Sequence, residues 1–399
     1  MKITGIRFVR IKGTWDYDGP LGEDRSASPL GLYPELAPAR RTWPIPHVEA
    51  GSPYPLQAIY MLVDTDEGAS GLYGNIPADE ARIIATQLAR IVIGENPHAV
   101  QRIWDKLYRS AVTGRKGPTM QAISKLDLAL WDLKGKLLGA PVYELLGGPT
   151  RDRIPAYASM LGYSAEPERA SERSREMVAQ GYTAIKWFFR YGAGDGPEGL
   201  RRNLALVRAV REAVGPDVEI MFDAWKSWDV PYALRMIELA APHRPCWFEE
   251  PVMPDMVRDY AEIRRRAAGR VLIAGGEHEY TRWGMRALLE AGAVDLLQPD
   301  PSWAGGISEM VKICALASAH QVPVYPHHGG LASAHLIASQ SPTLCPRQEW
   351  ILQAGRRDNH LLRHKIEPVD GHFALPPGPG LGLELDESAI ESREEIVFS

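Results

Sequence analysis

The pattern of hydrophobic and polar residues differs between the two halves of the chain. In about the first 145 residues, strand-like runs and then helical patterns follow one another without alternation, which is typical of an α+β domain. The strands and helices expected there cover residues 1–11, 58–64, 78–94, 96–108 and 119–138. The second of these helices is expected to have Asn96 as its N-cap residue and Pro97 at its first position.

After Gly147-Gly148-Pro149 the pattern changes, and strand-like runs alternate with helical ones. Strands are expected at residues 154–159, 183–189, 218–222, 246–248, 271–274, 294–297, 322–325 and 350–352, with a helix in each interval. Such alternation predicts a parallel sheet in an α/β domain. Because eight strands fit into about 200 residues, a closed barrel is favoured over an open sheet.

A long segment between the first two expected strands is rich in proline. It contains eight prolines between Pro20 and Pro55. A loop of that length in a compact domain is usually a lid or disordered. Arg41 and His47 lie in it and would suit a lid over an anionic substrate, although a solvated surface loop explains the segment equally well.

Polar residues follow five consecutive expected strands of the second half. Asp223, Glu249, Glu277, Asp300 and His327 each come just after an apolar run, at intervals of 26, 28, 23 and 27 residues. One strand, one helix and two loops of a parallel barrel consume about this length. We therefore expect these side chains to converge on one mouth of the barrel.

The chemistry of these five residues indicates a metal site beside a base. Three carboxylates, Asp223, Glu249 and Glu277, suit a hard cation such as Mg²⁺, which also removes their mutual repulsion. Each acid alone could be a surface residue or a helix N-cap, but repetition at strand ends weakens that alternative. A lone histidine is more often structural, whereas His327 beside Asp300 has the carboxylate partner that a general base needs.

Composition narrows the class of protein. With a formal charge of −5 and a pI near 6.2, the 399-residue chain carries no basic field for nucleic acid or anionic lipid. The amino end lacks the apolar core of a signal peptide, and no apolar run approaches the ~18 residues of a membrane span. A cytoplasmic enzyme without nucleic-acid or membrane partners is expected.

Several stretches resemble one family in the same order along the chain. Residues 123–136 (ISKLDLALWDLKGK) and 139–148 (GAPVYELLGG) are similar to the signature of the mandelate racemase group of the enolase superfamily. The later matching pieces are FDAW (222–225), WFEEP (247–251), GGEH (275–278), QPD (298–300) and PH (326–327).

This resemblance implies a modified TIM barrel, (β/α)7β, at residues 150–355. It also implies an α+β capping domain at residues 1–145, on which the segment of about 360–399 packs back. It assigns Mg²⁺ ligation to Asp223, Glu249 and Glu277, and the role of base to His327 with Asp300. Glu250 is left out of the ligand set because strand alternation would turn it away from Glu249.

Position along the chain suggests further substrate contacts. These are Lys186 for the substrate carboxylate, His278 for hydroxyl groups or the leaving group, Trp225 as a pocket wall, Arg41 and His47 in the lid, and Glu349, which resembles a substrate-side glutamate of the group. Each of them could instead be a structural or surface residue.

One departure from the group narrows the reaction. Racemases of the group carry a Lys-x-Lys pair at the second barrel strand, whereas this chain has Lys186-Trp187-Phe188. Without an amine at Phe188, the resemblance implies one-base chemistry. His327 removes the proton α to a carboxylate, Mg²⁺ stabilises the enediolate, and a β-hydroxyl leaves. The expected activity is that of a hydro-lyase, an acid-sugar dehydratase acting on an aldonate such as an L-rhamnonate-like one.

Two other functions stay open at this point. An epimerase, racemase or lactone cycloisomerase of the same superfamily would use another group as the second acid or base. A non-catalytic barrel kept for binding would leave the ligand triad and the dyad without a purpose. In either case we expect a small-molecule partner and a homo-oligomer, since apolar helices on a barrel exterior permit assembly.

Overall fold

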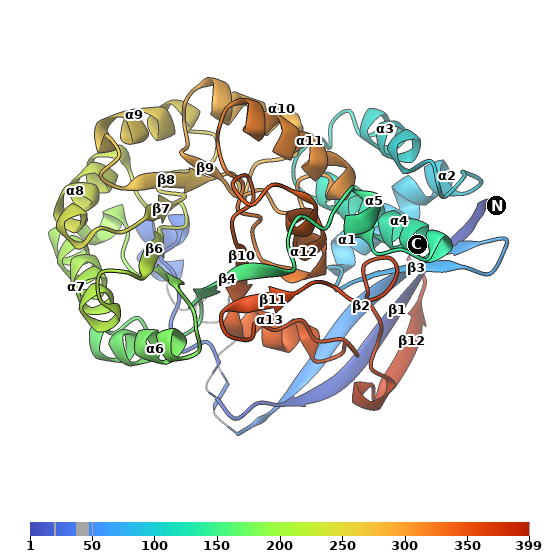
Figure 1. The fold of residues 1–399 in the computed structure, drawn as a ribbon, viewed down its shortest axis with the longest axis horizontal. Coiled ribbons are helices and arrows are strands. Elements are labelled where there is room, and N and C mark those ends of the chain that lie inside the picture. Colours follow the sequence, from blue (N-terminus) through green and yellow to red (C-terminus); the bar gives the residue numbers. More distant parts are fainter. Residues whose placement is uncertain (20, 37–47, 50, 399) are drawn as a thin grey trace.

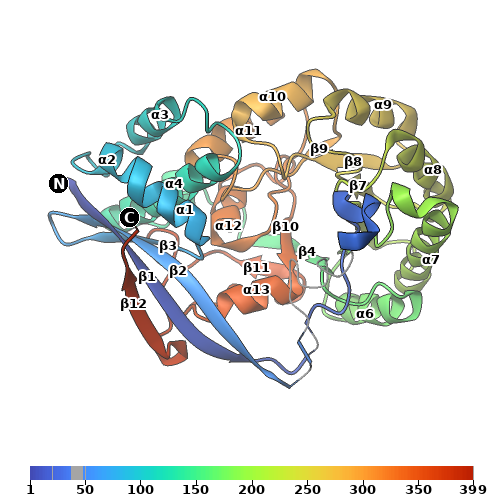
Figure 2. The ribbon, with the colours of Figure 1, turned by 180° about the vertical axis from the view of Figure 1, so that it is seen from behind.

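The computed structural model describes residues 1–19, 21–36, 48–49 and 51–398. A curled sheet surrounded by helices forms one part of the molecule, and a sheet with helices on one side forms the other (Figure 1; Figure 2 shows the same parts from behind). No helix in these described ranges is long and apolar enough to cross a membrane.

The cap is an antiparallel sheet with helices packed against it. Its strands lie in the order β12 (Ser392–Ile396), β1 (Ile3–Asp16), β2 (Pro53–Thr65), β3 (Ser70–Gly74). The helical segments are α1 (Ala78–Ile83), a π-helical turn (Ile84–Leu88), α2 (Ala89–Val92), α3 (Val100–Ser110), α4 (Pro118–Leu138) and α5 (Val142–Leu145). Since β12 pairs with β1, the two ends of the chain share one sheet.

Two helix predictions in the cap can be compared with the structure. Helix α4 ends at Gly139, whose φ of 66° gives the expected left-handed cap. The prediction that Asn96 is the N-cap residue of the preceding helix is wrong, because that helix, α3, begins only at Val100. The Asn96 side chain instead accepts a hydrogen bond from the backbone N–H of His98 at 2.9 Å, which makes a turn before the helix.

The barrel sheet is parallel along its main path. Its order is β10 (Gln348–Ile351), β4 (Arg153–Ser159), β5 (Ala184–Phe188), β6 (Glu219–Asp223), β7 (Trp247–Glu249), β8 (Leu272–Gly275), β9 (Leu296–Leu297), and β11 (His372–Ala374) pairs antiparallel with β4. The helices around it are α6 (Pro167–Ala179), α7 (Gly196–Val214), α8 (Val230–Ala240), α9 (Val257–Ala267), α10 (Thr281–Glu290), α11 (Gly306–Ala319), α12 (Gly330–Ser339) and α13 (Leu352–Asn359). Short 3-10 turns are η1 (Pro29–Leu32), η2 (Pro34–Leu36), η5 (Ala193–Asp195), η6 (Ala241–His243) and η7 (Glu387–Ala389).

The predicted fold class, a modified (β/α)7β barrel with an α+β cap, is confirmed. The strand predicted at residues 322–325 is wrong in extent, because only Val324 forms a bridge, to Leu297. Pro323 and Pro326 flank this short stretch, and proline has no N–H to donate to a sheet. The chain still follows the barrel wall there, and it delivers His327 to the same end as the other strands.

Side-chain alternation in the strands determines what lies at the mouth of the barrel. A cluster of buried side chains, Tyr157, Ala184, Met221, Trp247, Ala274 and Leu296, fills the barrel interior. Residues two positions further along a strand point to the same side. Lys186, Asp223 and Glu249 therefore follow Ala184, Met221 and Trp247 along the inner face and end at the carboxyl edge.

Helix α4 of the cap holds the loop that carries Asp300. The Ser124 hydroxyl accepts the N–H of Gly305 at 2.8 Å, and Lys125 donates to the carbonyl of Ser302 at 3.0 Å. The Asp127 carboxylate accepts the N–H of Ser308 at 3.0 Å, in the first turn of α11. The cap thus holds the segment from Ser302 to Ser308 in place through three hydrogen bonds.

This packing predicts different effects for two glycines that start helices. Gly306 has φ 75° and Gly330 has φ 85°, and a methyl group would overlap Asp127 at Gly306 but meet nothing within 4 Å at Gly330. Alanine at positive φ costs about 1–2 kcal/mol at either position. Gly306→Ala should lose about 1–3 kcal/mol more from overpacking. Urea unfolding would check this, and equal losses in both variants would contradict the proposed contact between α4 and α11.

Candidate active site

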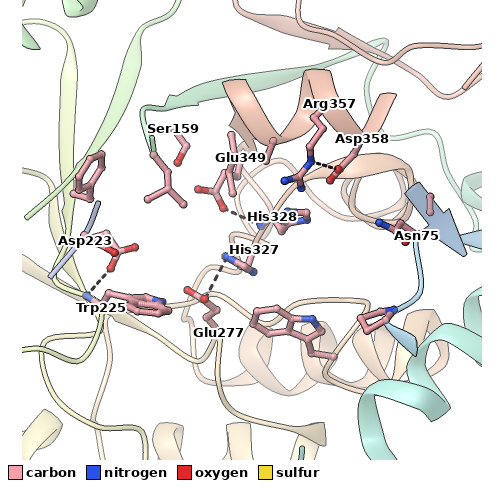
Figure 3. A pocket seen from close by; sticks show the side chains of 18 of the residues that line it. Asn75, Ser159, Asp223, Trp225, Glu277, His327, His328, Glu349, Arg357 and Asp358 are labelled. Carbon is pink, nitrogen blue, oxygen red and sulfur yellow. Dashed lines mark hydrogen bonds and ion pairs between the residues drawn. The ribbon is translucent and has the colours of Figure 1, made fainter. Parts of the chain in front are cut away.

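A cavity of about 540 Å³ lies between the carboxyl ends of the barrel strands and a wall made by β2 and α13. Lys186, Asp223, Glu277, His327 and Glu349 line it from the barrel side. Figure 3 shows Asp223, Glu277, His327 and Glu349 gathered toward one part of the pocket. Arg41 and His47, the expected lid contacts, lie outside the described residues.

His327 and Asp300 form a hydrogen-bonded pair beside this cavity. His327 Nδ1 lies 2.9 Å from Asp300 Oδ2, and Asp300 Oδ1 accepts both the N–H of Ser302 at 2.6 Å and its hydroxyl at 2.7 Å. Burial would raise the pKa of Asp300, but the bond to His327 lowers it to about 2. Asp300 is therefore ionised and fixes Nδ1 as the protonated nitrogen of the ring.

The second ring nitrogen of His327 faces an acid. Its Nε2 lies 3.4 Å from Glu277 Oε1. Burial would lower the pKa of His327, but the charge of Glu277, followed by the bond to Asp300, raises it to about 10. As long as Glu277 is a bare carboxylate, His327 is thus held in its protonated form at neutral pH.

Lys186 is shared by two fully buried acids. Its Nζ lies 2.7 Å from Glu249 Oε1 and 2.8 Å from Glu349 Oε1, and the exposed fraction of the residue is 4%. Glu249 also accepts a hydrogen bond from the Gln298 amide at 2.7 Å. Burial would lower the pKa of Lys186, but Glu249 and Glu349 raise it well above its ordinary value, so the ammonium stays charged. The single positive charge of Lys186 is therefore shared between two acids at the mouth of the barrel.

Asp223 and Glu277 carry charge that these lysine contacts do not neutralise. Asp223 Oδ1 accepts the N–H of Trp225 at 2.7 Å, and burial followed by the charge of Glu249 raises the pKa of Asp223 well above its ordinary value. Six carboxylates gather at the mouth among the described residues, and the side chains that form ion pairs with them are two lysines and two histidines, while a third histidine, His328, lines the cavity. Even if both paired imidazoles are protonated, these partners leave two of the six negative charges uncompensated, and the all-oxygen donor set of Asp223, Glu249 and Glu277 is of the kind that a hard divalent cation takes.

Glu250 does not point away from the mouth, which corrects our expectation from strand alternation. Strand β7 ends at Glu249, and Glu250 takes a left-handed φ of 42° that turns its side chain toward His278. Glu250 Oε2 lies 2.9 Å from His278 Nδ1 and 3.2 Å from Lys226 Nζ. Glu250, Glu277 and His278 offer ligand atoms within 4.8 Å of one another, but Lys226 and His278 already compensate the charge of Glu250.

Aromatic rings form the walls around these charged groups. Phe188 lines the cavity at the end of β5, level with Asp223 in the sheet register. Trp225 lines it as expected, and Lys226 Nζ lies 4.1 Å from the centre of its ring. The ring of Trp303 lies 5.5 Å from His278 and 5.1 Å from His327, measured between centroids.

Several residues in or beside this cavity were not predicted from the sequence. Trp303 lines the cavity three residues after Asp300, and Lys226, three residues after Asp223, pairs with Glu250, so both lie in loops that directly follow predicted strands. Arg357 and Asp358 come from α13, after the last barrel strand, and carry no motif. Folding alone brings these two residues to the cavity.

Comparison with known proteins gives the class to which this fold and site belong. Residues 169–389 match the family model described as enolase C-terminal domain-like, and residues 44–147 match that of the mandelate racemase / muconate lactonizing enzyme N-terminal domain. The chain is similar to the L-rhamnonate dehydratase of Saccharopolyspora erythraea, with 36% identity over 97% of each chain.

Solved structures agree with this match. The rhamnonate dehydratase of Gibberella zeae, in a crystal structure complexed with Mg, superposes with a TM-score of 0.82 at 31% identity, covering 97% of this chain and 95% of that one. The 3,6-anhydro-D-galactonate cycloisomerase of Zobellia galactanivorans gives a TM-score of 0.77 at 27% identity, covering 98% of this chain and 100% of that one. These matches define an enzyme of the enolase superfamily. Within it, the chain belongs to the mandelate racemase and muconate lactonizing enzyme family.

The shared ammonium of Lys186 leads to a stability prediction. Lys186→Met leaves Glu249 and Glu349 buried without their cation, which should cost about 3–5 kcal/mol at pH 7. Lys186 overcomes burial and lowers the pKa of Glu349 to about 2, so this stabilisation is present above the ordinary carboxyl pKa and is lost as pH falls through about 2.

In the variant, burial alone would raise both carboxyl pKa values, and protonation at pH 5 should narrow the gap to the native protein. Urea unfolding at pH 7 and pH 5 measures both effects. Lys106→Met, which breaks the more exposed pair with Glu95, is the control and should cost less than about 1 kcal/mol. A loss in Lys186→Met no larger than in this control would contradict the assignment.

Proposed function

We propose that this protein is a Mg²⁺-dependent dehydratase of an acid sugar, with an L-rhamnonate-like aldonate as substrate. The observation that carries the proposal is that the site has one candidate base and no basic residue at the position where a second base would be needed. His327 with Asp300 supplies one base, whereas Phe188 occupies the strand end at which a second base would be needed. The named relatives from Saccharopolyspora erythraea and Gibberella zeae support a dehydratase.

Asp223, Glu249 and Glu277 are the residues that we propose to hold the cation. When bound, Mg²⁺ would supply positive charge opposite the negative charge that develops on the substrate carboxylate, and it would neutralise Glu277. Because the charge of Glu277 is the largest influence that raises the pKa of His327, its neutralisation leaves His327 free to be an unprotonated base.

The residues of the chain then perform a β-elimination. His327 Nε2 accepts the proton on the carbon next to the substrate carboxylate, while Asp300 stabilises the imidazolium through Nδ1. The electron pair of the broken C–H bond forms a C=C bond as the β-hydroxyl leaves with a proton as water. The resulting enol rearranges to a 2-keto-3-deoxy acid.

Other residues around the cavity are proposed to bind and orient the substrate. Lys186, between Glu249 and Glu349, contributes positive charge beneath the substrate carboxylate. His278 and Glu349 are proposed hydroxyl contacts, and His278 is also the residue that we propose to protonate the leaving group. Trp225 forms a wall.

A second candidate function is an isomerase of the same family. The structural match to a 3,6-anhydro-D-galactonate cycloisomerase favours it, since the same proton abstraction can begin an isomerisation that loses no water. Incubation with L-rhamnonate in deuterated water separates the two. A semicarbazide-reactive keto acid supports dehydration, whereas recovered substrate with deuterium and inverted C2 supports epimerisation and would contradict the proposal. Full retention of fold without turnover of any aldonate or aldarate would favour a binding protein.

The role of His327 can be tested by His327→Asn. The amide cannot accept a proton at this position, so turnover should fall by at least ~10²–10⁴-fold. Mg²⁺ affinity by calorimetry should stay within a few-fold. His320→Asn, at the exposed end of α11, is the control. Substantial residual turnover would rule out His327 as the base.

The ligand set can be tested by comparing two neutral substitutions. Glu277→Gln removes a proposed ligand charge and should weaken Mg²⁺ binding by at least ~10–100-fold. Glu250→Gln should change it only a few-fold, because Lys226 and His278 already hold Glu250. Calorimetry with Mg²⁺ measures both. If Glu250→Gln weakened binding as much as Glu277→Gln, the ligands would be Glu250, Glu277 and His278 instead.

A further inference from the structure

We infer that Arg357 and Asp358 form a second subsite of the cavity, which binds an uncharged, hydroxyl-bearing end of the substrate and disfavours a second carboxylate. The inference rests on the proposed function and deepens it, because it selects monocarboxylic aldonates over dicarboxylic aldarates. It also assigns a role to a helix that carries no recognised motif.

The position of the pair follows from the face that α13 turns to the cavity. Ala354, Arg357 and Asp358 of α13 line it, at the spacing of three to four residues that places side chains on one side of a helix, and Ile351 before the helix and Leu361 after it line it as well. In Figure 3, Arg357 and Asp358 lie well apart from Asp223 and Glu277, with His328 seen between the two groups. A ligand whose carboxylate is held near Asp223 and Glu277 would extend toward α13.

The two side chains form a pair that is neutral as a whole but still has hydrogen-bond donors and an acceptor that a ligand can use. Arg357 Nε donates to Asp358 Oδ1 at 2.9 Å, and the side chains are 25% and 35% exposed. This bond uses one of the five N–H donors of the guanidinium. Among the described residues, its Nη groups and Asp358 Oδ2 have no side-chain hydrogen-bond partner. A hydroxyl group is both donor and acceptor, so it can donate to Asp358 and accept from Arg357 at once.

The residues around the pair fit a sugar chain. Leu56, Ala354 and Leu361 present carbon surface to the cavity, which suits the C–H faces of a sugar acid. Tyr60 lines the same part, and burial together with the charge of Asp358 raises its pKa far above neutrality, so it offers a neutral hydroxyl. Asn75 adds an amide, and its Oδ1 accepts the N–H of Ile59 at 3.2 Å.

Charge explains why the pair discriminates between acids. An unpaired arginine would attract a second carboxylate through a two-pronged contact. Asp358 cancels this attraction and repels an anion at close range. Removing Asp358 should therefore favour a dicarboxylate, and removing Arg357 should disfavour it further. A purely structural role of the pair would not produce shifts of opposite sign.

The test uses L-mannonate and L-mannarate, which differ only in a hydroxymethyl group or a carboxylate at C6. Affinities are measured by calorimetry with Mg²⁺ in the His327→Asn background, where binding is separated from turnover. We expect the aldonate to bind at least tenfold more tightly. Adding Asp358→Asn should move the ratio of affinities at least tenfold toward the aldarate, and adding Arg357→Gln should move it at least threefold the other way.

Arg356→Gln is the matched control, since Arg356 neighbours the pair in α13 but faces Glu367 at 3.8 Å instead of the cavity. Its ratio should equal that of the parent, and circular dichroism checks that all variants fold. Unchanged ratios in both test variants, with binding retained, would overturn the subsite alone. If the native chain dehydrated no acid sugar and the parent variant bound neither acid, the proposed function would fail and the subsite with it.

Discussion

The mouth of this barrel depends on an imbalance between buried carboxylates and the cations available to them. One ammonium group, that of Lys186, serves both Glu249 and Glu349, and Lys226 serves Glu250. These contacts leave Asp223 and Glu277 facing the cavity with charge that burial makes costly. A divalent cation relieves this cost, and the same cation would adjust the protonation of His327 through Glu277. The proposed metal site and the proposed base are therefore coupled electrostatically.

The cap also helps to orient these residues, because it bonds to the loop that follows Asp300. Ser124, Lys125 and Asp127 of α4 each bond to the loop that runs from Asp300 into α11. The loop also supplies Ser302, which fixes the second oxygen of Asp300. Because Asp300 in turn bonds to the ring of His327, contacts of the cap help to orient the residue that we propose as the base. On the far side of the cavity, β2 and α13 form the opposite wall.

The sequence predicts much of this arrangement because strand ends recur with a regular period. Asp223, Glu249, Glu277, Asp300 and His327 are visible as polar residues after apolar runs, and parallel strands bring such positions to one edge. The failures have local causes: prolines shorten the strand at residues 322–325, and Asn96 bonds to its own turn. Glu250 departs from alternation because its backbone turns left-handed where β7 ends.

The sequence does not show which residues from distant parts of the chain come together in the fold. Arg357 and Asp358 reach the cavity from a segment that carries no periodic signal, and Lys186 of β5 pairs with Glu349 of β10, on the other side of β4 and 163 residues away in the chain. The most direct test of the account is anomalous diffraction from crystals grown with Mn²⁺ in place of Mg²⁺. We predict one ion within ligand distance, about 2.0–2.4 Å, of Asp223, Glu249 and Glu277, with Glu250 still paired to Lys226. An ion bound by Glu250 and His278 instead would contradict the account.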